Sequence, residues 1–147
     1  MSAVSVQTAD FDVAAELAAL EALGGGGVAS FTGIVRGHGD VIALELEHHP
    51  AMTVPQIEEI VQQATARWPL LGARVIHRVG KLDAGARIVF VGTASRHRTA
   101  ALEACAFLID WLKVGAPFWK KTHHADGRHS WVEAQAADSA KAEQWRR

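Results

Sequence analysis

Two lysines in the C-terminal third of the sequence have the residue type and spacing for chemistry on an anion. Lys113 ends an apolar stretch, and Lys120 follows seven residues later, beyond Gly115 and Pro117. Glycine ends helices and proline cannot continue them, so we expect the chain to fold back here and to bring both ammonium groups to one pocket. Two cations in a pocket of low dielectric would bind an anion and stabilise negative charge that develops during a reaction.

The aromatic pair Phe118-Trp119 lies between these lysines. Aromatic walls lower the local dielectric, depress the pKa of a lysine and can stack a flat heterocycle. An aromatic pair of this kind is also common in a hydrophobic core, so the spacing leaves both interpretations open.

A second cationic group, His97 and Arg98, comes at the start of the apolar stretch that Lys113 ends. If this stretch is a helix, its first amide groups also favour a bound anion. The two ends of such a helix lie some 20 Å apart at about 1.5 Å per residue. One protomer therefore need not bring both cationic groups to one small ligand, whereas a symmetric dimer can.

Charge is divided unequally along the chain, although the formal net charge is −1. Residues 1–66 contain nine acidic residues and a single base, Arg36, for a net charge of −8. Residues 67–147 contain fourteen Lys or Arg and seven acidic residues, for a net charge of +7. Three interpretations stay open: a basic region that binds an anion, two oppositely charged faces that meet in an oligomer, or charges that mix once the chain folds.

The basic half supports two alternative functions. A nonenzymatic nucleic-acid- or anion-binding module would use the basic C-terminal half together with its interleaved Trp and Phe residues. A Schiff-base enzyme would use a desolvated Lys113 as its nucleophile, but no phosphate-cofactor motif supports it. The acidic residues 1–66 and the near-neutral total argue against nucleic-acid binding.

The other reactive side chains give weaker signals. The single cysteine, Cys105, excludes a disulfide framework, and its apolar surroundings predict a small buried side chain rather than a nucleophile. Adjacent histidines such as His48-His49 and His123-His124 point to opposite faces of a strand, so we predict no metal site. Gly24–Gly27 is not followed by the Lys and Ser or Thr of a phosphate-binding loop, and we predict no cofactor.

Length and composition predict one domain over residues 1–147, since 49% hydrophobic and 21% charged residues are typical of a globular unit. The longest apolar runs are far short of the roughly 20 residues that a bilayer span needs, and no signal peptide is recognisable. We therefore expect a cytoplasmic protein without membrane contact. Residues 136–147 are expected to fray or to form a short helix.

Hydrophobic periodicity predicts three main helices that alternate with pairs of strands. The helices are expected at Phe11–Leu23, from Thr53 as N-cap to about Trp68, and at Thr99–Val114. The strands are expected at Val28–Val35, Val41–Glu47, Arg74–Val79, Arg87–Gly92, Phe118–Thr122 and His129–Ala134. Short turns between paired strands favour antiparallel sheets, so the predicted fold class is α+β rather than a doubly wound parallel sheet.

Six blocks, in order along nearly the whole chain, resemble the large, catalytic subunit of molybdopterin synthase. The most specific block is Asp110-Trp111-Leu112-Lys113-Val114-Gly115-Ala116-Pro117-Phe118-Trp119-Lys120. The others are Phe31-Thr32-Gly33-Ile34-Val35-Arg36, Leu46-Glu47-His48-His49-Pro50-Ala51-Met52, Ile76-His77-Arg78-Val79-Gly80, Val89-Phe90-Val91-Gly92 and Ser95-Arg96-His97-Arg98. The match extends through Trp131-Val132-Glu133.

The resemblance implies a hammerhead-like α+β subunit that forms a homodimer and binds one small ubiquitin-like sulfur-carrier protein per protomer, giving a heterotetramer. The C-terminal Gly-Gly thiocarboxylate of that carrier would enter the pocket and donate sulfur. Two such transfers would convert cyclic pyranopterin monophosphate into the dithiolene of molybdopterin. The resemblance implies neither a resident cofactor nor a nucleic-acid partner.

By the same resemblance, Lys113 and Lys120 are the catalytic lysines. Arg36, His97 and Arg98 match substrate-binding positions, where recognition of phosphate or pterin is expected. The expected substrate-binding set also includes three neighbours of these residues: Ile34, Val35 and Lys121.

The chain departs from the family pattern at two places. Gln135 stands where the family often has a cation. The stretch Thr122–Ser130 is rich in histidine and unlike the usual connector, so no binding role is assigned to it. Neither departure involves the lysine pair.

Overall fold

The computed structural model describes residues 3–132 and 143–146. Within these ranges the chain forms three α-helices, eight strands and a short 3-10 helix. In chain order the elements are β1 (Val4–Gln7), α1 (Val13–Glu21), β2 (Gly27–Ile34), β3 (Val41–His48), α2 (Pro50–Arg67), β4 (Leu70–Arg78), β5 (Gly80–Asp83), β6 (Arg87–Ser95), α3 (Arg98–Val114), β7 (Phe118–His124), β8 (His129–Trp131) and the 3-10 helix Gln144–Arg146.

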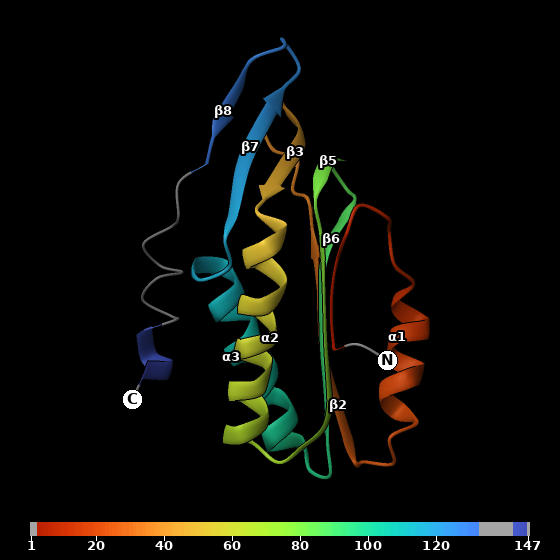
Figure 1. The fold of residues 1–147 in the computed structure, drawn as a ribbon. Helices are drawn as coiled ribbons and strands as arrows, with labels where there is room; N and C mark the ends of the chain where they lie inside the picture. Colours follow the sequence, from red (N-terminus) through yellow and green to blue (C-terminus); the bar gives the residue numbers. More distant parts are fainter. Residues whose placement is uncertain (1–2, 133–142, 147) are drawn as a thin grey trace.

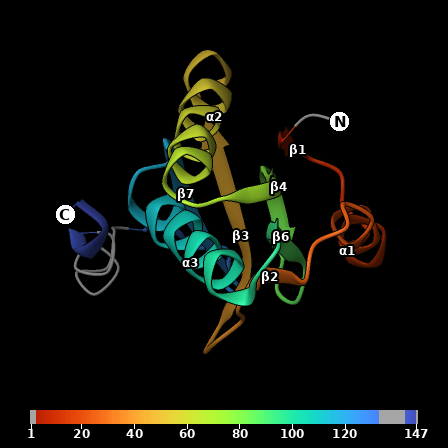
Figure 2. The same ribbon diagram turned by 90° about the horizontal axis from the view of Figure 1, so that it is seen from below.

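The first sheet forms the middle layer of a three-layer arrangement. Its strand order is β1-β4-β6-β2, with β4 and β2 antiparallel to β6 and with β1 parallel to β4. Helix α1 covers one face, and α2 and α3 lie side by side on the other (Figures 1 and 2). The α+β class and the three helices are confirmed, and the parallel β1–β4 pair is the exception to the expected antiparallel pairing.

The second sheet has the strand order β5-β3-β7-β8 and is antiparallel throughout. Strand β7 follows α3 directly and pairs with β3, with Lys120 opposite Leu46. The sheet extends beyond the helices at one end of the molecule (Figure 1). It therefore carries Lys120 back to the end of α3 where Lys113 lies.

Three local expectations were wrong. Strand β1 gave no signal because four residues are too short for a clear alternation, and β5 lies within the predicted turn. Leu82 of β5 is buried in a cluster with β3, so tertiary pairing rather than local preference makes this strand. Helix α2 begins at Pro50 with His49 as N-cap, and the Thr53 hydroxyl donates a hydrogen bond of 2.9 Å to the His49 carbonyl from inside the helix.

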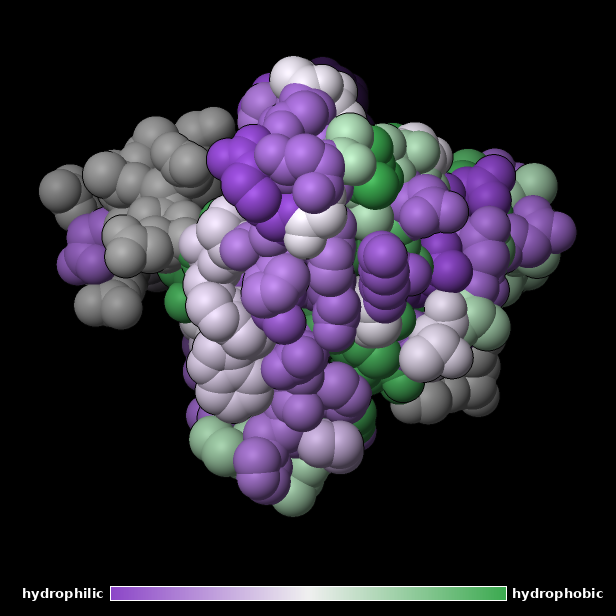
Figure 3. Space-filling model, turned by 90° about the horizontal axis from the view of Figure 1, so that it is seen from above, coloured by the Kyte–Doolittle hydropathy of each residue, from purple (hydrophilic) through white to green (hydrophobic). Residues whose placement is uncertain are grey.

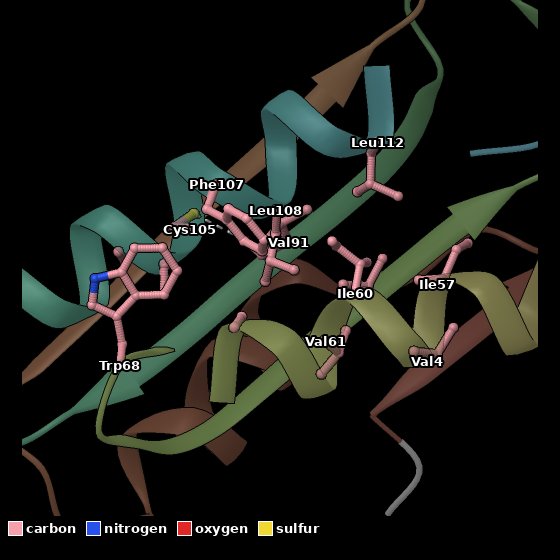
Figure 4. Packing of buried hydrophobic residues seen from close by; sticks show 14 of the residues in the cluster. Val4, Ile57, Ile60, Val61, Trp68, Val91, Cys105, Phe107, Leu108 and Leu112 are labelled. Carbon is pink, nitrogen blue, oxygen red and sulfur yellow. Dashed lines mark hydrogen bonds between the residues drawn. The ribbon is translucent and has the colours of Figure 1, made fainter. Parts of the chain in front are cut away.

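The main core lies between the first sheet and the pair α2 and α3 (Figure 4). Ile60 of α2, Val91 of β6 and Leu108 of α3 are fully buried there. Cys105 is also buried, and burial raises the pKa of its thiol to about 11. The prediction of a buried Cys105 is confirmed. Each described helix is too short or too polar to cross a membrane.

Candidate functional site

Lys113 and Lys120 line the same pocket, between the end of α3 and strands β2, β6 and β7. The pocket is narrow, and its empty space of about 380 Å³ includes solvent at the open mouth. Its lining consists of these two lysines, His77 and six apolar residues: Phe31, Ile88, Val89, Val91, Ile109 and Leu112. The structure therefore brings the two lysines together, as the expected fold-back of the chain requires.

A tight turn after α3 brings the lysines together. The Gly115 N–H donates a hydrogen bond of 2.7 Å to the Trp111 carbonyl, which ends the helix. A Cβ atom at position 115 would lie 2.6 Å from the indole ring of Trp111, so only glycine lets the chain pass here. The chain then turns through Ala116 and Pro117 into β7, where the Phe118 N–H donates to the Ala116 carbonyl at 2.8 Å.

His77 of β4 is a pocket residue that the sequence analysis did not select. Its side chain is only 5% exposed, and its Nδ1 lies 2.9 Å from the Arg78 carbonyl. Burial, assisted by the charges of Lys120 and Lys113, lowers the pKa of His77 to about 4. The imidazole is therefore neutral near pH 7. The sequence signal was a histidine directly after the apolar residues Val75 and Ile76.

The two aromatic residues between the lysines have different roles. The ring of Phe118 stacks on His77, with centroids 3.9 Å apart and planes 21° apart. Trp119, the next residue on β7, is 54% exposed. Because successive side chains of a strand point to opposite faces, Phe118 lies on the same face of β7 as Lys120 while Trp119 faces outward. Phe118 contacts the pocket residue His77, whereas the aromatic residue that lines the lysine pocket is Phe31.

Lys121 lies on the opposite face of β7 from Lys120. It is opposite Glu45 in the β3–β7 register, and its ammonium group lies 4.7 Å from the ring centroid of Trp131. It does not line the lysine pocket. A substrate contact by Lys121 stays a prediction and would require a ligand that reaches around the strand.

The segment with Ile34, Val35 and Arg36 ends β2. The Ile34 side chain is 51% exposed and Arg36 is exposed, whereas Val35 is 3% exposed within an apolar cluster. The Val35 N–H donates to the Ala86 carbonyl and its own carbonyl accepts from Gly85, each at 2.8 Å. Ile34 and Arg36 are therefore available to a ligand, while Val35 holds the segment against the start of β6.

His97 and Arg98 lie at the start of α3, far from the lysine pocket. Both are exposed, and His97 is the N-cap residue of the helix. With 17 residues, α3 is about 25 Å long, and Lys113 is in its last turn. His97 lines a separate, shallow pocket with residues such as Arg96 and Trp68. A single chain therefore does not bring these substrate-binding candidates to the two lysines.

The charges of the two halves mix when the chain folds. Arg74 of β4 forms an ion pair of 2.8 Å with Glu16 of α1, and three further pairs between the halves have the same or a slightly longer separation. They are Arg87–Asp10 at 3.0 Å, Arg128–Asp40 at 2.8 Å and Arg78–Asp10 at 3.8 Å. The basic half thus meets acidic partners from the first half, and the charge argument for a nucleic-acid-binding module loses its basis.

The His-rich stretch forms the β7–β8 hairpin and contacts acidic residues of the first half. Nε2 of His123 lies 2.8 Å from Glu45 Oε1, and Nδ1 of His124 lies 2.8 Å from Asp40 Oδ1. Within residues 3–132 and 143–146, no group of three His, Cys, Asp or Glu side chains is placed to hold a metal ion. Gln135 lies outside the described residues. The structure thus gives the hairpin histidines a packing and pairing role.

The surface at the end of the molecule formed by the second sheet is mainly hydrophilic. Hydrophobic residues are visible in the recesses beside its central ridge (Figure 3). Among the exposed apolar side chains of the described chain are Ile34, Ile42, Trp119, Trp131 and Val132.

Comparison with known proteins agrees with this geometry. The model of the MoaE protein family matches residues 6–115. A molybdopterin synthase catalytic subunit from Mesorhizobium japonicum is 50% identical over 97% of this chain and 92% of its own length. One from Escherichia coli (strain K12) is 50% identical over 82% of this chain and 81% of its own length.

Solved structures share the fold. The molybdopterin biosynthesis MoaE protein from Burkholderia ambifaria superposes with a TM-score of 0.84 at 43% identity, covering 100% of this chain and 99% of that one. A molybdopterin synthase from Staphylococcus aureus superposes with a TM-score of 0.79 at 26% identity, covering 90% of this chain and 98% of that one.

These matches decide between the classes of function that the sequence left open. Curated relatives that match almost the entire chain are catalytic subunits of an enzyme of molybdenum cofactor biosynthesis. The nonenzymatic alternative is therefore wrong, and the resemblance carried by the six sequence blocks is confirmed. The chain belongs to the MoaE protein family, whose relatives named here are the catalytic subunits of molybdopterin synthase.

Proposed function

We propose that this chain transfers sulfur from the C-terminal thiocarboxylate of a small ubiquitin-like carrier protein to cyclic pyranopterin monophosphate, forming the dithiolene of molybdopterin. The observation that carries the proposal is the presence of Lys113 and Lys120 in one largely apolar pocket. The catalytic subunits that match this chain are named as parts of a larger enzyme, which supports a small-subunit partner.

The two lysines bring together reactants that repel each other. A thiocarboxylate and a phosphate are both anionic, and their approach must be compensated before a C–S bond forms. Lys113 is exposed at the pocket mouth and Lys120 is half-buried, so the pair spans the path from solvent to the pocket. The apolar lining strengthens the attraction of both ammonium groups for an anion.

Each transfer then has two chemical steps. In the first transfer the carrier's sulfur attacks a carbon of the substrate while a bond from carbon to phosphate oxygen breaks, which opens the cyclic phosphate and leaves the carrier attached as a thioester. Water next attacks the thioester carbonyl, and the carrier leaves as a carboxylate while sulfur stays on the substrate. Lys113 or Lys120 stabilises the oxyanion of the second step or donates a proton to the departing oxygen of the first. In the second transfer the sulfur of a second carrier attacks the neighbouring carbon, whose oxygen leaves as water, and hydrolysis of the second thioester again releases the carrier as a carboxylate.

Substrate recognition requires cations that one chain does not place in the pocket. Arg36 lies at the end of β2, and His97 and Arg98 lie at the far end of α3, about 25 Å from Lys113. A homodimer would solve this, because a symmetric contact can place the α3 start of one protomer beside the lysine pocket of the other. The complete assembly is then a heterotetramer with two carriers. A cytoplasmic location stays a prediction.

The direct test is turnover with purified components. Wild-type chain, thiocarboxylated carrier and cyclic pyranopterin monophosphate are mixed, and dithiolene formation is measured. Lys113→Ala is expected to abolish product while its circular dichroism and unfolding midpoint match the wild type. Lys81→Ala, which removes an exposed lysine of β5, is the matched control and is expected to keep full activity. Near-normal turnover by Lys113→Ala would rule out the assigned role.

A further inference from the structure

The floor of the lysine pocket contains one polar group that the proposed reaction does not use. His77 lines the pocket together with Lys113 and Lys120 and is 5% exposed. Three elements converge there, because His77 comes from β4, Lys113 from α3 and Lys120 from β7. A buried histidine between two ammonium groups has an environment that disfavours a third positive charge.

The hydrogen bonding of His77 fixes which ring nitrogen carries the proton. A backbone carbonyl can only accept, so Nδ1, 2.9 Å from the Arg78 carbonyl, must be the N–H donor. In the neutral ring Nε2 then has no hydrogen and offers a lone pair. The ring is held flat against Phe118 at a centroid distance of 3.9 Å. Both the tautomer and the orientation of the imidazole are therefore set by the fold.

Among the neighbours of the His77 ring, the two lysines are the groups that can donate a hydrogen bond to its Nε2. The ring of His48 in β3 is tilted by 39° to the Phe118 ring, with centroids 6.2 Å apart, and its Nδ1 is 3.2 Å from the Thr53 hydroxyl. His48 does not line the pocket. The charged and titratable groups that act on His77 are Lys120, Lys113 and His48, and none of them is an acid.

We propose that His77 is a positioning residue for the lysine pair, whose Nε2 lone pair accepts a hydrogen bond from the ammonium group of Lys113 or Lys120 and so aims that group at the reacting atoms. A neutral acceptor orients a cation without neutralising it, which a carboxylate in the same place would do. This inference rests on the proposed function only in treating the two lysines as the groups that touch the substrate.

The first test measures the lysines themselves and needs no turnover. An acceptor stabilises the ammonium form, so its loss makes the amine more reactive toward acylation at a fixed pH. In His77→Phe, which keeps an aromatic ring against Phe118, acetylation of Lys113 or Lys120 by acetic anhydride at pH 8 is expected to accelerate at least threefold. Peptide mass spectrometry gives the rates, and the exposed Lys81 serves as the internal reference. Unchanged rates at both pocket lysines would overturn the proposal, whatever the activity.

The second test separates positioning from a structural role. His77→Phe is expected to lower kcat about tenfold to a hundredfold, the cost of a misplaced catalytic group, and to leave KM for the carrier within about twofold. His77→Gln keeps a polar acceptor near the place of Nε2 and is expected to restore most of kcat and the wild-type acetylation rates. His48→Phe, which alters the other imidazole on Phe118, is the matched control and should keep kcat within about twofold.

The outcomes distinguish this inference from the proposed function. If the wild type transfers no sulfur, the proposed function fails, while the acetylation rates still decide whether His77 holds the lysines. If the wild type is active and His77→Phe keeps its kcat, the positioning role fails and the function stands. Equal losses in His77→Phe and His77→Gln with unchanged unfolding midpoints would also contradict the role of the Nε2 lone pair.

Discussion

Trp145 donates a hydrogen bond of 2.8 Å from its indole Nε1 to Oδ2 of Asp110 in α3. The same indole packs edge-on against Phe107 and Trp68, each at a centroid distance of 5.8 Å. The Trp145 carbonyl also accepts a 2.8 Å hydrogen bond from the Arg67 guanidinium. The 3-10 helix Gln144–Arg146 is thus attached to both α2 and α3, which agrees with the short helix expected in the tail; residues 136–142 and 147 lie outside the described residues.

Replacing this tryptophan should therefore destabilise the domain. Trp145→Ala removes one hydrogen bond and two aromatic contacts from a half-buried position, and we expect a loss of about 2 kcal/mol in the free energy of unfolding. Thermal unfolding should show a midpoint lower by about 5 °C. Trp131→Ala, at a 56% exposed position of β8, is the control and should cost less than about 1 kcal/mol. Equal midpoints for Trp145→Ala and wild type would show that the tail is not attached in solution.

Arginine substitutions separate the two roles open to the lysines. Arginine keeps the positive charge but does not release a proton at accessible pH. If a lysine acts only by electrostatic attraction, its Arg variant should keep a measurable fraction of kcat, within about a hundredfold of wild type. If the lysine donates a proton, its Arg variant should be as inactive as its Ala variant. Single-turnover rates of Lys113→Arg and Lys120→Arg, compared with Lys113→Ala and Lys120→Ala, assign the roles.

A complementation experiment tests whether two protomers build each site. Lys113→Ala and Arg98→Ala should each be inactive as homodimers. If Arg98 of one protomer serves the lysine pocket of the other, a mixed dimer contains one site with both residues and one with neither. Random mixing by co-expression then gives activity in about a quarter of the sites.

A failure of the two variants to complement each other would also locate Arg98. A mixture with no more activity than its parents would place Arg98 and Lys113 in the same site of a single chain or in unrelated sites. Co-expression of Lys113→Ala with Lys120→Ala is the control, because both residues line one pocket of one chain and each mixed-dimer site lacks one lysine. That pair should not complement.

Much of the fold followed from local patterns, and the misses have physical causes. Helix α3 was predicted within one residue at its start because its apolar face is long. Its end at Val114 was predicted because Gly115 follows. The start of α2 was placed at Thr53 because threonine is a common N-cap, but Pro50 is also favoured in a first turn and starts the helix earlier. Strands β1 and β5 exist through pairing with distant strands, which no short window of sequence contains.

The site was predicted in part for similar reasons. The spacing of Lys113 and Lys120 around Gly115 and Pro117 is local, so their common pocket could be inferred. His77 is 36 residues before Lys113, and its neutral, buried state depends on packing that only the folded chain shows. The separation of His97 from the lysines was expected from the length of one helix. The pairing of the acidic and basic halves depends on tertiary contacts and could not be decided from composition.

The buried state of His77 also predicts how stability depends on pH. Its pKa is about 4 in the folded protein, against an ordinary value of 6.5, chiefly because burial disfavours the charged ring. Between these values the unfolded chain binds a proton that the folded chain does not, so unfolding is favoured as the pH falls. The stabilising contribution is complete above about pH 6.5 and is lost toward pH 4, and it amounts to about 3 kcal/mol over the whole window.

Urea unfolding at pH 7, 6 and 5 should measure this dependence. We expect wild type to lose about 2 kcal/mol between pH 7 and pH 5 from this group, and His77→Gln to lack that loss. Carboxylates whose pKa is lowered in the fold, such as Glu45 beside His123 and Asp40 beside His124, lose their contribution only as the pH falls below their ordinary values of 4.5 and 3.8. They therefore leave the window above pH 5 to His77. Parallel curves for wild type and His77→Gln would mean that His77 is charged or solvated in the folded protein, and the acceptor role of Nε2 would fall with it.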